Sequence, residues 1–140
     1  MELVVGVSLL QYLKSLPGKK IPESECCYIY KQIVNGISYL HKLNIIHRDI
    51  KLENIIINPD NKYIKIIDYG FGCITAKSKL LNFFCGTPSY MPPEIIQKRD
   101  YIGFYADIWS LGILLFTLLC GAFPFKGMIN NIVSNNLLLL

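Results

Sequence analysis

"HRDIKLENIII" occupies residues 47–57 and places a cluster of charged and polar side chains directly before three isoleucines. Two basic residues, two carboxylates, a histidine and an asparagine fall within eight positions of a chain that is 52% hydrophobic and 17% charged. Such side chains bind hard metal ions and phosphates and transfer protons. This stretch is therefore the first candidate for a functional site.

The composition is typical of a globular domain. A chain of 140 residues can bury a core, and its high apolar content argues against disorder. The net charge of +4 comes from dispersed lysines, so we expect neither a nucleic-acid interface nor a polybasic membrane patch. The apolar run at 111–123 is shorter than the ~20 residues that span a bilayer and precedes Pro124, which favours a buried core helix over membrane insertion.

Cysteine usage and the N-terminus indicate an intracellular, cytoplasmic protein. The five cysteines are an odd number without C-x-x-C spacing, which favours reduced thiols and no thiolate metal site. The first ten residues lack the basic flank and the cleavage site of a signal peptide. We therefore do not expect secretion.

Two helices are predicted in the first third of the chain. Ser8 and Gln11 have the spacing of a capping box, which predicts a short helix from Ser8 to about Leu16. A long amphipathic helix is predicted over 23–42, because apolar residues there recur every three or four positions. Its predicted buried face comprises Cys26, Tyr30, Ile33, Val34, Ile37 and Leu40.

A β-hairpin is predicted next, with strands at 55–57 and 63–67 and a turn at 58–62 that contains Pro59. The residue before the first strand and the residue after the second must lie at the same end of a hairpin. This topology places Asn54 beside Asp68, and Asp49 can reach the same place. A site built from such oxygen donors suits Mg²⁺, which takes one or two carboxylates together with water and phosphate oxygens.

The second half of the chain is predicted to contain one loop and one central helix. Residues 70–94 are rich in glycine and proline and show no sustained period, so we expect a long functional or disordered loop. Residues 107–120 are apolar almost all round, as in a helix at the centre of a core, and Gly121 is placed to end that helix. The predicted fold class is therefore mainly α with a small β-hairpin.

Four motifs together resemble a known family. "HRDIKLEN" (47–54), "DYG" (68–70), "GTPSYMPPE" (86–94) and "DIWSLG" (107–112) are similar, in order and spacing, to the catalytic loop, metal-binding motif, substrate-facing loop and central helix of eukaryotic protein kinases. Lys51 and Thr87 favour the serine/threonine kinases, and the flanking residues lean towards the calcium/calmodulin-dependent and AMP-activated group. The resemblance makes 1–127 a partial kinase domain, from the hinge segment through the central helix, and leaves 128–140 unassigned.

The resemblance implies roles for individual residues, with ATP and Mg²⁺ as cofactors. Asp49 and Lys51 would be catalytic. Asn54 and Asp68 would hold the metal. The implied ATP-binding residues are Met1, Leu3, Ser8, Lys51, Asn54, Ile56 and Asp68. Glu53 and Thr87 would face the substrate. Structural or regulatory roles are implied for His47, packed beneath Tyr69, and for Arg48, Tyr69, Glu94 and Asp107.

The chain departs from the family at several positions. Phe83 occupies the place of a phosphorylated threonine in many relatives, which would leave Arg48 without its usual phosphate partner. Thr75 and Ser78 lie further back in the same loop as possible substitutes. Tyr69 stands in the place of phenylalanine and Leu52 in the place of proline, and the arginine expected to pair with Glu94 is absent.

The family's glycine-rich loop, strand lysine and helix glutamate are not among the 140 residues. We therefore expect a fragment: the core of the large, C-terminal lobe of a kinase, with the small lobe absent. The resemblance implies transfer of the γ-phosphoryl group of Mg-ATP to a serine or threonine of a protein substrate. We expect this chain to be inactive alone. The alternative is a kinase-like binding module without phosphotransfer activity, and a regulatory partner remains open.

Overall fold

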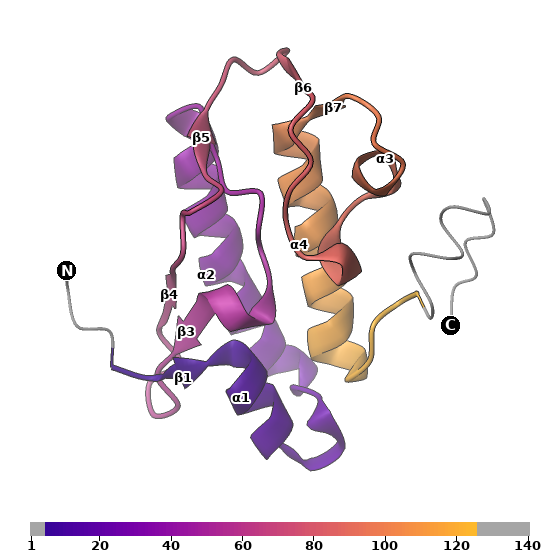
Figure 1. Cartoon of the computed structure of the whole chain (residues 1–140). Helices are drawn as coiled ribbons and strands as arrows, with labels where there is room; N and C mark the ends of the chain where they lie inside the picture. Colours follow the sequence, from indigo (N-terminus) through magenta and orange to yellow (C-terminus); the bar gives the residue numbers. More distant parts are fainter. Residues whose placement is uncertain (1–4, 126–140) are drawn as a thin grey trace.

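The computed structural model describes residues 5–125, and two long helices form its centre. Helices α2 (Glu23–Lys42) and α4 (Gly103–Cys120) pack against each other, and the smaller elements lie around them (Figure 1). The predicted fold class, mainly α with a small hairpin, agrees with this architecture. The predicted residues Met1 and Leu3, and the tail 128–140, lie outside the described part of the chain.

The first helix forms as predicted. Strand β1 (Val7–Ser8) leads into α1 (Leu9–Ser15), and a 3₁₀ helix, η1 (Pro17–Lys19), follows. The Ser8 hydroxyl accepts the Gln11 N–H at 3.2 Å, and the Gln11 side chain accepts the Ser8 N–H at 3.1 Å. This reciprocal pair is the predicted capping box, which satisfies two backbone donors at the helix start.

Helix α2 has the predicted bounds, but its buried face is slightly rotated from the prediction. The fully buried side chains are Cys26, Ile29, Ile33 and Ile37. Ile29 was not predicted, whereas Val34 was predicted to be buried and is 36% exposed. The reason is geometric, because Ile29 lies between Cys26 and Ile33 on the same face of the helix.

The predicted hairpin is confirmed. Strands β3 (Ile55–Ile57) and β4 (Ile64–Ile66) pair antiparallel, with Ile55 opposite Ile66, and β1 pairs with the other edge of β3. The turn is closed by the Asn58 side chain, which accepts the N–H of Asp60 at 2.9 Å. Such side-chain bonds explain why Asn is favoured at the start of a turn.

The predicted loop at 70–94 contains more structure than expected. Strand β5 (Cys73–Ile74) pairs with β2 (Ile45–Ile46), and β6 (Leu80–Leu81) pairs with β7 (Tyr101–Ile102). The 3₁₀ helix η3 (Pro88–Tyr90) and helix α3 (Pro93–Ile96) follow. The prediction of an irregular loop was therefore partly wrong. Strands of two residues are too short to show a period, so only pairing with distant segments defines them.

Helix α4 begins four residues before the predicted start and ends as predicted. It starts at Gly103, where an added Cβ would collide with the Ile46 side chain. Gly121 ends the helix in a left-handed conformation with φ of 71°, which glycine adopts without steric cost. The early start lets the helix pack closely against β2.

By length and composition alone, α4 could cross a membrane. Half of its residues are buried inside the protein, however, and the core helices of soluble proteins meet the same criterion. Within the described residues it serves as a core helix.

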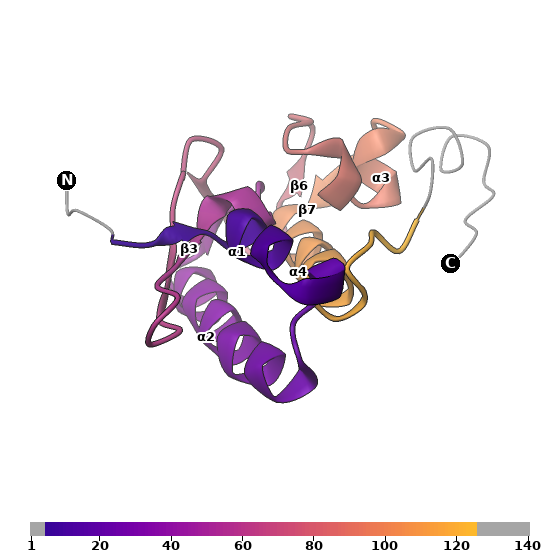
Figure 2. The ribbon, with the colours of Figure 1, turned by 90° about the horizontal axis from the view of Figure 1, so that it is seen from below.

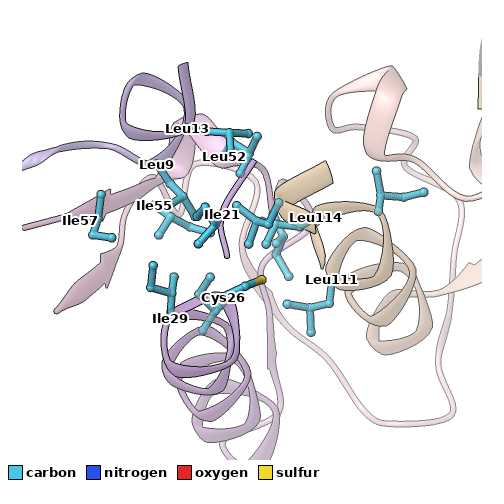
Figure 3. Packing of buried hydrophobic residues seen from close by; sticks show 14 of the residues in the cluster. Leu9, Leu13, Ile21, Cys26, Ile29, Leu52, Ile55, Ile57, Leu111 and Leu114 are labelled. Carbon is cyan, nitrogen blue, oxygen red and sulfur yellow. The ribbon is translucent and has the colours of Figure 1, made fainter. Parts of the chain in front are cut away.

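One large apolar cluster joins all the elements that hold the polar stretch at 47–54. Figure 3 shows side chains from α1, α2, α4 and the segment 52–57 converging on a common centre. From below, α1 lies beside β3 (Figure 2), which it contacts directly. The 3₁₀ helix η2 (Leu52–Asn54) buries Leu52 in this cluster. The residues just before it, 47–51, which we call the polar loop, are thereby anchored to the apolar core.

A polar cluster between α1, α2 and the β3–β4 turn gives a first prediction. The Tyr12 hydroxyl donates to Glu25 Oε1 at 2.6 Å and accepts from the Lys62 ammonium group. We expect Tyr12→Phe to lower the free energy of unfolding by about 1 kcal/mol, because a bridging hydroxyl is lost. In a thermal melt this is a decrease of roughly 3–4 °C. Tyr63→Phe, at a largely exposed position, is the matched control.

The cluster should also weaken at alkaline pH. Burial and the bond to Glu25 raise the pKa of Tyr12, and the hydrogen bond to Tyr12 raises the pKa of Lys62. Raised pKa values mean that the stabilisation is complete below the ordinary pKa values near 10 and is lost above them. The difference between wild type and Tyr12→Phe should therefore shrink above pH 10. A constant difference would contradict this assignment.

Candidate active site

The loop that follows β2 is held by a buried aspartate of the central helix. Asp107 is 1% exposed and accepts the backbone N–H groups of His47, at 2.9 Å, and Arg48, at 2.8 Å. Its Oδ2 also lies 2.8 Å from Nε2 of His41. The carboxylate therefore ties the start of the polar loop and the end of α2 to α4.

His47 lies inside the protein and has structural contacts on both ring nitrogens. Nδ1 accepts the N–H of Asp49 at 3.3 Å, and Nε2 lies 3.3 Å from the carbonyl oxygen of Ile67. These contacts fit the tautomer that carries its proton on Nε2. The ring packs against Tyr69 with centroids 5.1 Å apart. His47 thus connects the polar loop to the end of β4.

Asp49 is the centre of a compact polar cluster. Its Oδ2 lies 2.7 Å from the Lys51 ammonium nitrogen, and its Oδ1 accepts the Thr87 hydroxyl at 2.8 Å. Lys51 also donates to Thr87 Oγ1 at 2.9 Å, so the three side chains form a closed ring of contacts. The Asn54 amide donates to both Asp49 Oδ2, at 3.0 Å, and the Asp49 carbonyl, at 2.9 Å.

These contacts keep Asp49 ionised. Burial by itself would raise the pKa of the carboxyl, because it disfavours the charged form. Hydrogen bonds from Lys51 and Thr87, the charge of Lys51 and the Asn54 amide together outweigh burial and lower the pKa of Asp49 below its ordinary value. Asp49 is therefore a buried carboxylate, 5% exposed, that already accepts a hydrogen bond from a hydroxyl group.

Asn54 and Asp68 lie at the same end of the hairpin. The Ile67 N–H donates to the Asn54 carbonyl at 2.9 Å, so Asp68 follows at the end of the hairpin where Asn54 begins. Asp68 is exposed, has φ of 63°, and accepts the Gly70 N–H at 3.2 Å. The Asn54 amide nitrogen is held by Asp49, so its oxygen is the atom able to ligate a cation.

The donor set suits a hard cation. An amide oxygen and a carboxylate, without thiol or imidazole, match the preference of Mg²⁺. Residues 5–125 hold no group of three or more His, Cys, Asp and Glu side chains placed to bind a metal ion. A cation at Asn54 and Asp68 would therefore draw its remaining ligands from water or from phosphate oxygens.

The other predicted residues are spread around this centre. Ser8 caps α1 and pairs with Ile56 across the β1–β3 ladder, which places both on one sheet. Glu53 points from η2 into solvent, and Glu94 lies in the first turn of α3. Sequence reasoning did not single out His41 or Tyr90. His41 contacts the Asp107 carboxylate, and the Tyr90 hydroxyl accepts the backbone N–H of Leu52.

Arg48 contacts aromatic and backbone partners. Its Nε donates to the Phe71 carbonyl at 2.6 Å, and its guanidinium carbon lies 5.6 Å from the centre of the Phe83 ring. One side chain thus joins the two ends of the segment 71–83. Phe83 cannot be phosphorylated. Its ring instead contacts Arg48, the residue that the resemblance would leave without a phosphate partner.

This contact predicts a segment that is held without phosphorylation. Phe83→Leu removes the aromatic face, so we expect proteolytic cleavage within 71–83 to become roughly 2–5-fold faster, the equivalent of an exposed cation–π contact. Phe83→Tyr keeps the ring and is the matched control. Mass spectrometry and phosphatase treatment test the same point. A stoichiometric phosphate on Thr75 or Ser78, whose removal made the segment more accessible to protease, would show that the phosphorylation site lies at another residue of the same loop.

Comparison with known proteins provides independent information. The model of the "Protein kinase domain" family matches residues 1–138. The chain is 46% identical over 126 residues to "Probable serine/threonine-protein kinase HSL1" of Saccharomyces cerevisiae, covering 90% of this chain and 8% of the relative. It is 45% identical over 109 residues to "NUAK family SNF1-like kinase 1" of Mus musculus, covering 78% and 16%.

A plant protein is also similar. "CBL-interacting protein kinase 4" of Oryza sativa subsp. japonica is 38% identical over 128 residues, with 89% of this chain and 28% of the relative covered. The chain therefore spans less than a third of the length of each of these relatives.

Proposed function

The chain belongs to the protein kinase domain family, and from this premise we propose that it supplies the phosphoryl-transfer centre of a serine/threonine protein kinase. The predicted resemblance is confirmed, because the relatives are named serine/threonine kinases and include SNF1-like members. The observation that carries the proposal is the contact between the buried Asp49 carboxylate and the Thr87 hydroxyl at 2.8 Å. A serine or threonine of a substrate would present the same chemical group.

In the proposed reaction, Asp49 orients the substrate hydroxyl and accepts its proton as the oxygen attacks the γ-phosphorus of ATP, while the bond from that phosphorus to the β,γ-bridging oxygen breaks and ADP leaves. Lys51 lies 2.7 Å from Asp49 and can balance the negative charge of the transferred phosphoryl group. Thr87 contacts both side chains and keeps them in register. Mg²⁺ held by Asn54 and Asp68 would supply further charge neutralisation at the phosphates. Catalysis of this kind depends on positioning and electrostatics.

We further assign the described residues to the core of the large lobe, with 1–127 as the partial kinase domain. Ser8 and Ile56, adjacent in the β1–β3 ladder, would lie at the adenine, together with Met1 and Leu3. A protein substrate, an intracellular location, the absence of nucleic-acid partners and the absence of membrane insertion are parts of this proposal. The tail 128–140 has no assigned role.

A chimera tests the proposal most directly. Residues 5–125 replace the matching segment of the Saccharomyces cerevisiae relative, and the rest of that relative's chain is kept. We expect transfer from ATP to serine and threonine peptides and none to tyrosine peptides. The isolated 140-residue chain, assayed in parallel by calorimetry, should bind Mg-ATP weakly and show no measurable transfer. A folded chimera that binds ATP without transfer would instead support the binding module.

The metal assignment predicts a separate result. Asp68→Ala removes the only proposed carboxylate ligand, so we expect the affinity for Mn²⁺, used as a spectroscopic substitute for Mg²⁺, to fall by at least the roughly 10–100-fold that loss of an outer-shell partner costs. Electron paramagnetic resonance of the chimera measures free Mn²⁺ directly. Asp60→Asn, an exposed aspartate in the hairpin turn, is the matched control. Unchanged Mn²⁺ binding in Asp68→Ala would contradict the metal site.

A further inference from the structure

An open cavity lies where the end of α2, the start of α4 and the turn at 76–79 come together. Its volume is about 340 Å³, at the small end of the range for ligand-binding pockets. None of the proposed catalytic or metal-binding residues is among the described residues that line it. These are Ser38, His41 and Lys42 of α2, Lys77 of the turn, and Phe104 and Tyr105 of α4.

The turn bridges the ends of the two long helices. The Lys79 N–H donates to the Ala76 carbonyl at 3.1 Å, which closes the turn and leaves Lys77 at its tip. Before the turn, the Thr75 N–H donates at 2.9 Å to the carbonyl of Asn44, just after α2. After the turn, β6 pairs with β7, which leads into α4. Figure 1 shows this connection crossing from the end of α2 to the start of α4. The turn is therefore attached on both sides of the cavity.

The cavity carries unbalanced positive charge. Lys42 and Lys77 are exposed, and within residues 5–125 neither ammonium group makes an ion pair or a hydrogen bond. His41 already has a partner, with its Nε2 2.8 Å from Asp107 Oδ2, and no described carboxylate lines the cavity. A lysine in the last turn of a helix complements the helix dipole, which accounts for Lys42. It does not account for Lys77, which comes from a different segment and borders the same space.

One side of the cavity is aromatic. Phe104 is 9% exposed, and its ring packs edge-on against His41 with centroids 4.9 Å apart, so this side is already formed. Tyr105, the next residue, is 66% exposed, so most of its surface is open to a ligand. A small inorganic anion would bind the lysines and leave these rings uncovered, whereas an apolar side chain can bury them. The combination favours a ligand that has both negative charge and an apolar group.

We infer that this basic cavity is a docking site for an acidic peptide segment of a partner protein. An apolar side chain of that segment packs on the two aromatic rings, and its carboxylates lie beside Lys42 and Lys77. Such charges steer association and fix orientation, while the aromatic contact supplies most of the affinity. Because Lys77 belongs to the segment 71–83, the bound peptide also holds that segment against α2 and α4. The inference does not depend on the proposed phosphoryl transfer.

Fluorescence anisotropy with the full 140-residue chain tests the docking site. The labelled probe is the hexapeptide DEFLDE, and its comparison peptides are KKFLKK, with reversed charge, and DEGGDE, without the apolar pair. We expect only DEFLDE to bind. Its affinity should fall as salt is raised from about 0.05 M to about 0.5 M, because salt screens exposed charges. Absence of DEFLDE binding at millimolar concentration, or equal binding of either comparison peptide, would overturn the inference.

Substitutions locate the binding surface. Lys42→Ala and Lys77→Ala should each weaken DEFLDE binding by about 2–5-fold, which is the range for an exposed ion pair. Tyr105→Ala should weaken it by about 3–10-fold through the loss of aromatic surface. Lys31→Ala and Tyr28→Ala are the matched controls, at exposed positions of α2 that do not line the cavity. Equal losses in the controls and in the cavity variants would place the binding elsewhere and overturn the inference.

Proteolysis tests the effect on the segment 71–83. At a DEFLDE concentration of about ten times its Kd, trypsin cleavage after Lys77 should slow by roughly 5–10-fold, because only the free state is cut. Cleavage after Lys20, in the loop before α2, is the internal control and should not change. Unchanged cleavage after Lys77 would show that the peptide does not cover the turn, and would overturn the inference.

Two other anions serve as competing ligands for the same cavity. Vesicles of phosphatidylserine represent an anionic membrane, and inorganic phosphate represents a small free anion. We expect neither to displace DEFLDE at moderate salt, because neither buries the aromatic side of the cavity. If either one bound the chain through Lys42 and Lys77 while DEFLDE did not, the occupant would not be an acidic peptide and the inference would be overturned.

Discussion

Asp49→Asn should lower kcat of the chimera by about 10³-fold while lowering its melting temperature only a little, through the loss of the charge that Lys51, Thr87 and Asn54 stabilise. The substitution keeps the shape of the side chain and its contact distance to Thr87 but removes the negative charge. An amide cannot accept the proton of an attacking hydroxyl, and it cannot hold Lys51 by charge. The reaction therefore loses both its base and the lysine's fixed position, whereas the surrounding core keeps every apolar contact.

The measurement is steady-state transfer of labelled phosphate, paired with a thermal melt of the same preparation. Asp60→Asn removes an exposed carboxylate from the hairpin turn and should leave kcat unchanged. The KM for ATP should also change little in Asp49→Asn, because the proposed adenine contacts are elsewhere. A variant that kept a tenth or more of the parent activity would remove Asp49 from the proposed role.

Asp107→Ala should produce the largest loss of stability, roughly 3–5 kcal/mol. The carboxylate is 1% exposed and accepts the N–H groups of His47 and Arg48 and contacts His41. Its removal leaves buried donors without an acceptor, and each such donor costs about 1–3 kcal/mol. We expect the melting temperature to fall by roughly 10–15 °C.

Chemical denaturation of the 140-residue chain gives the free energy of unfolding directly. Asp100→Asn, an exposed aspartate just before β7, is the matched control and should shift the midpoint little. Asp107→Asn is a useful third variant: it restores the volume but turns one acceptor into a donor, so it should recover only part of the loss. Full recovery by Asp107→Asn would mean that volume, and not hydrogen bonding, accounts for the effect.

The sequence alone determined the elements whose causes are local. The capping box at Ser8, the apolar stripe of α2 and the isoleucine strands of the hairpin each depend on residues a few positions apart. The hairpin also predicted that Asn54 and Asp68 would lie at one end, because a two-stranded ladder leaves no other arrangement. The four motifs identified the family, which the comparisons confirmed.

Only the tertiary structure decided the contacts between distant segments. The bond from Leu52 to Tyr90 joins residues 38 positions apart, and the bond from Lys51 to Thr87 joins residues 36 apart. The Arg48–Phe83 contact and the paired strands β2–β5 and β6–β7 are of the same kind. None of these contacts leaves a period or a spacing in the sequence. Each partner binds a donor, a charge or an unpaired strand edge of a distant segment, and the packing of α2 on α4 brings the two segments together.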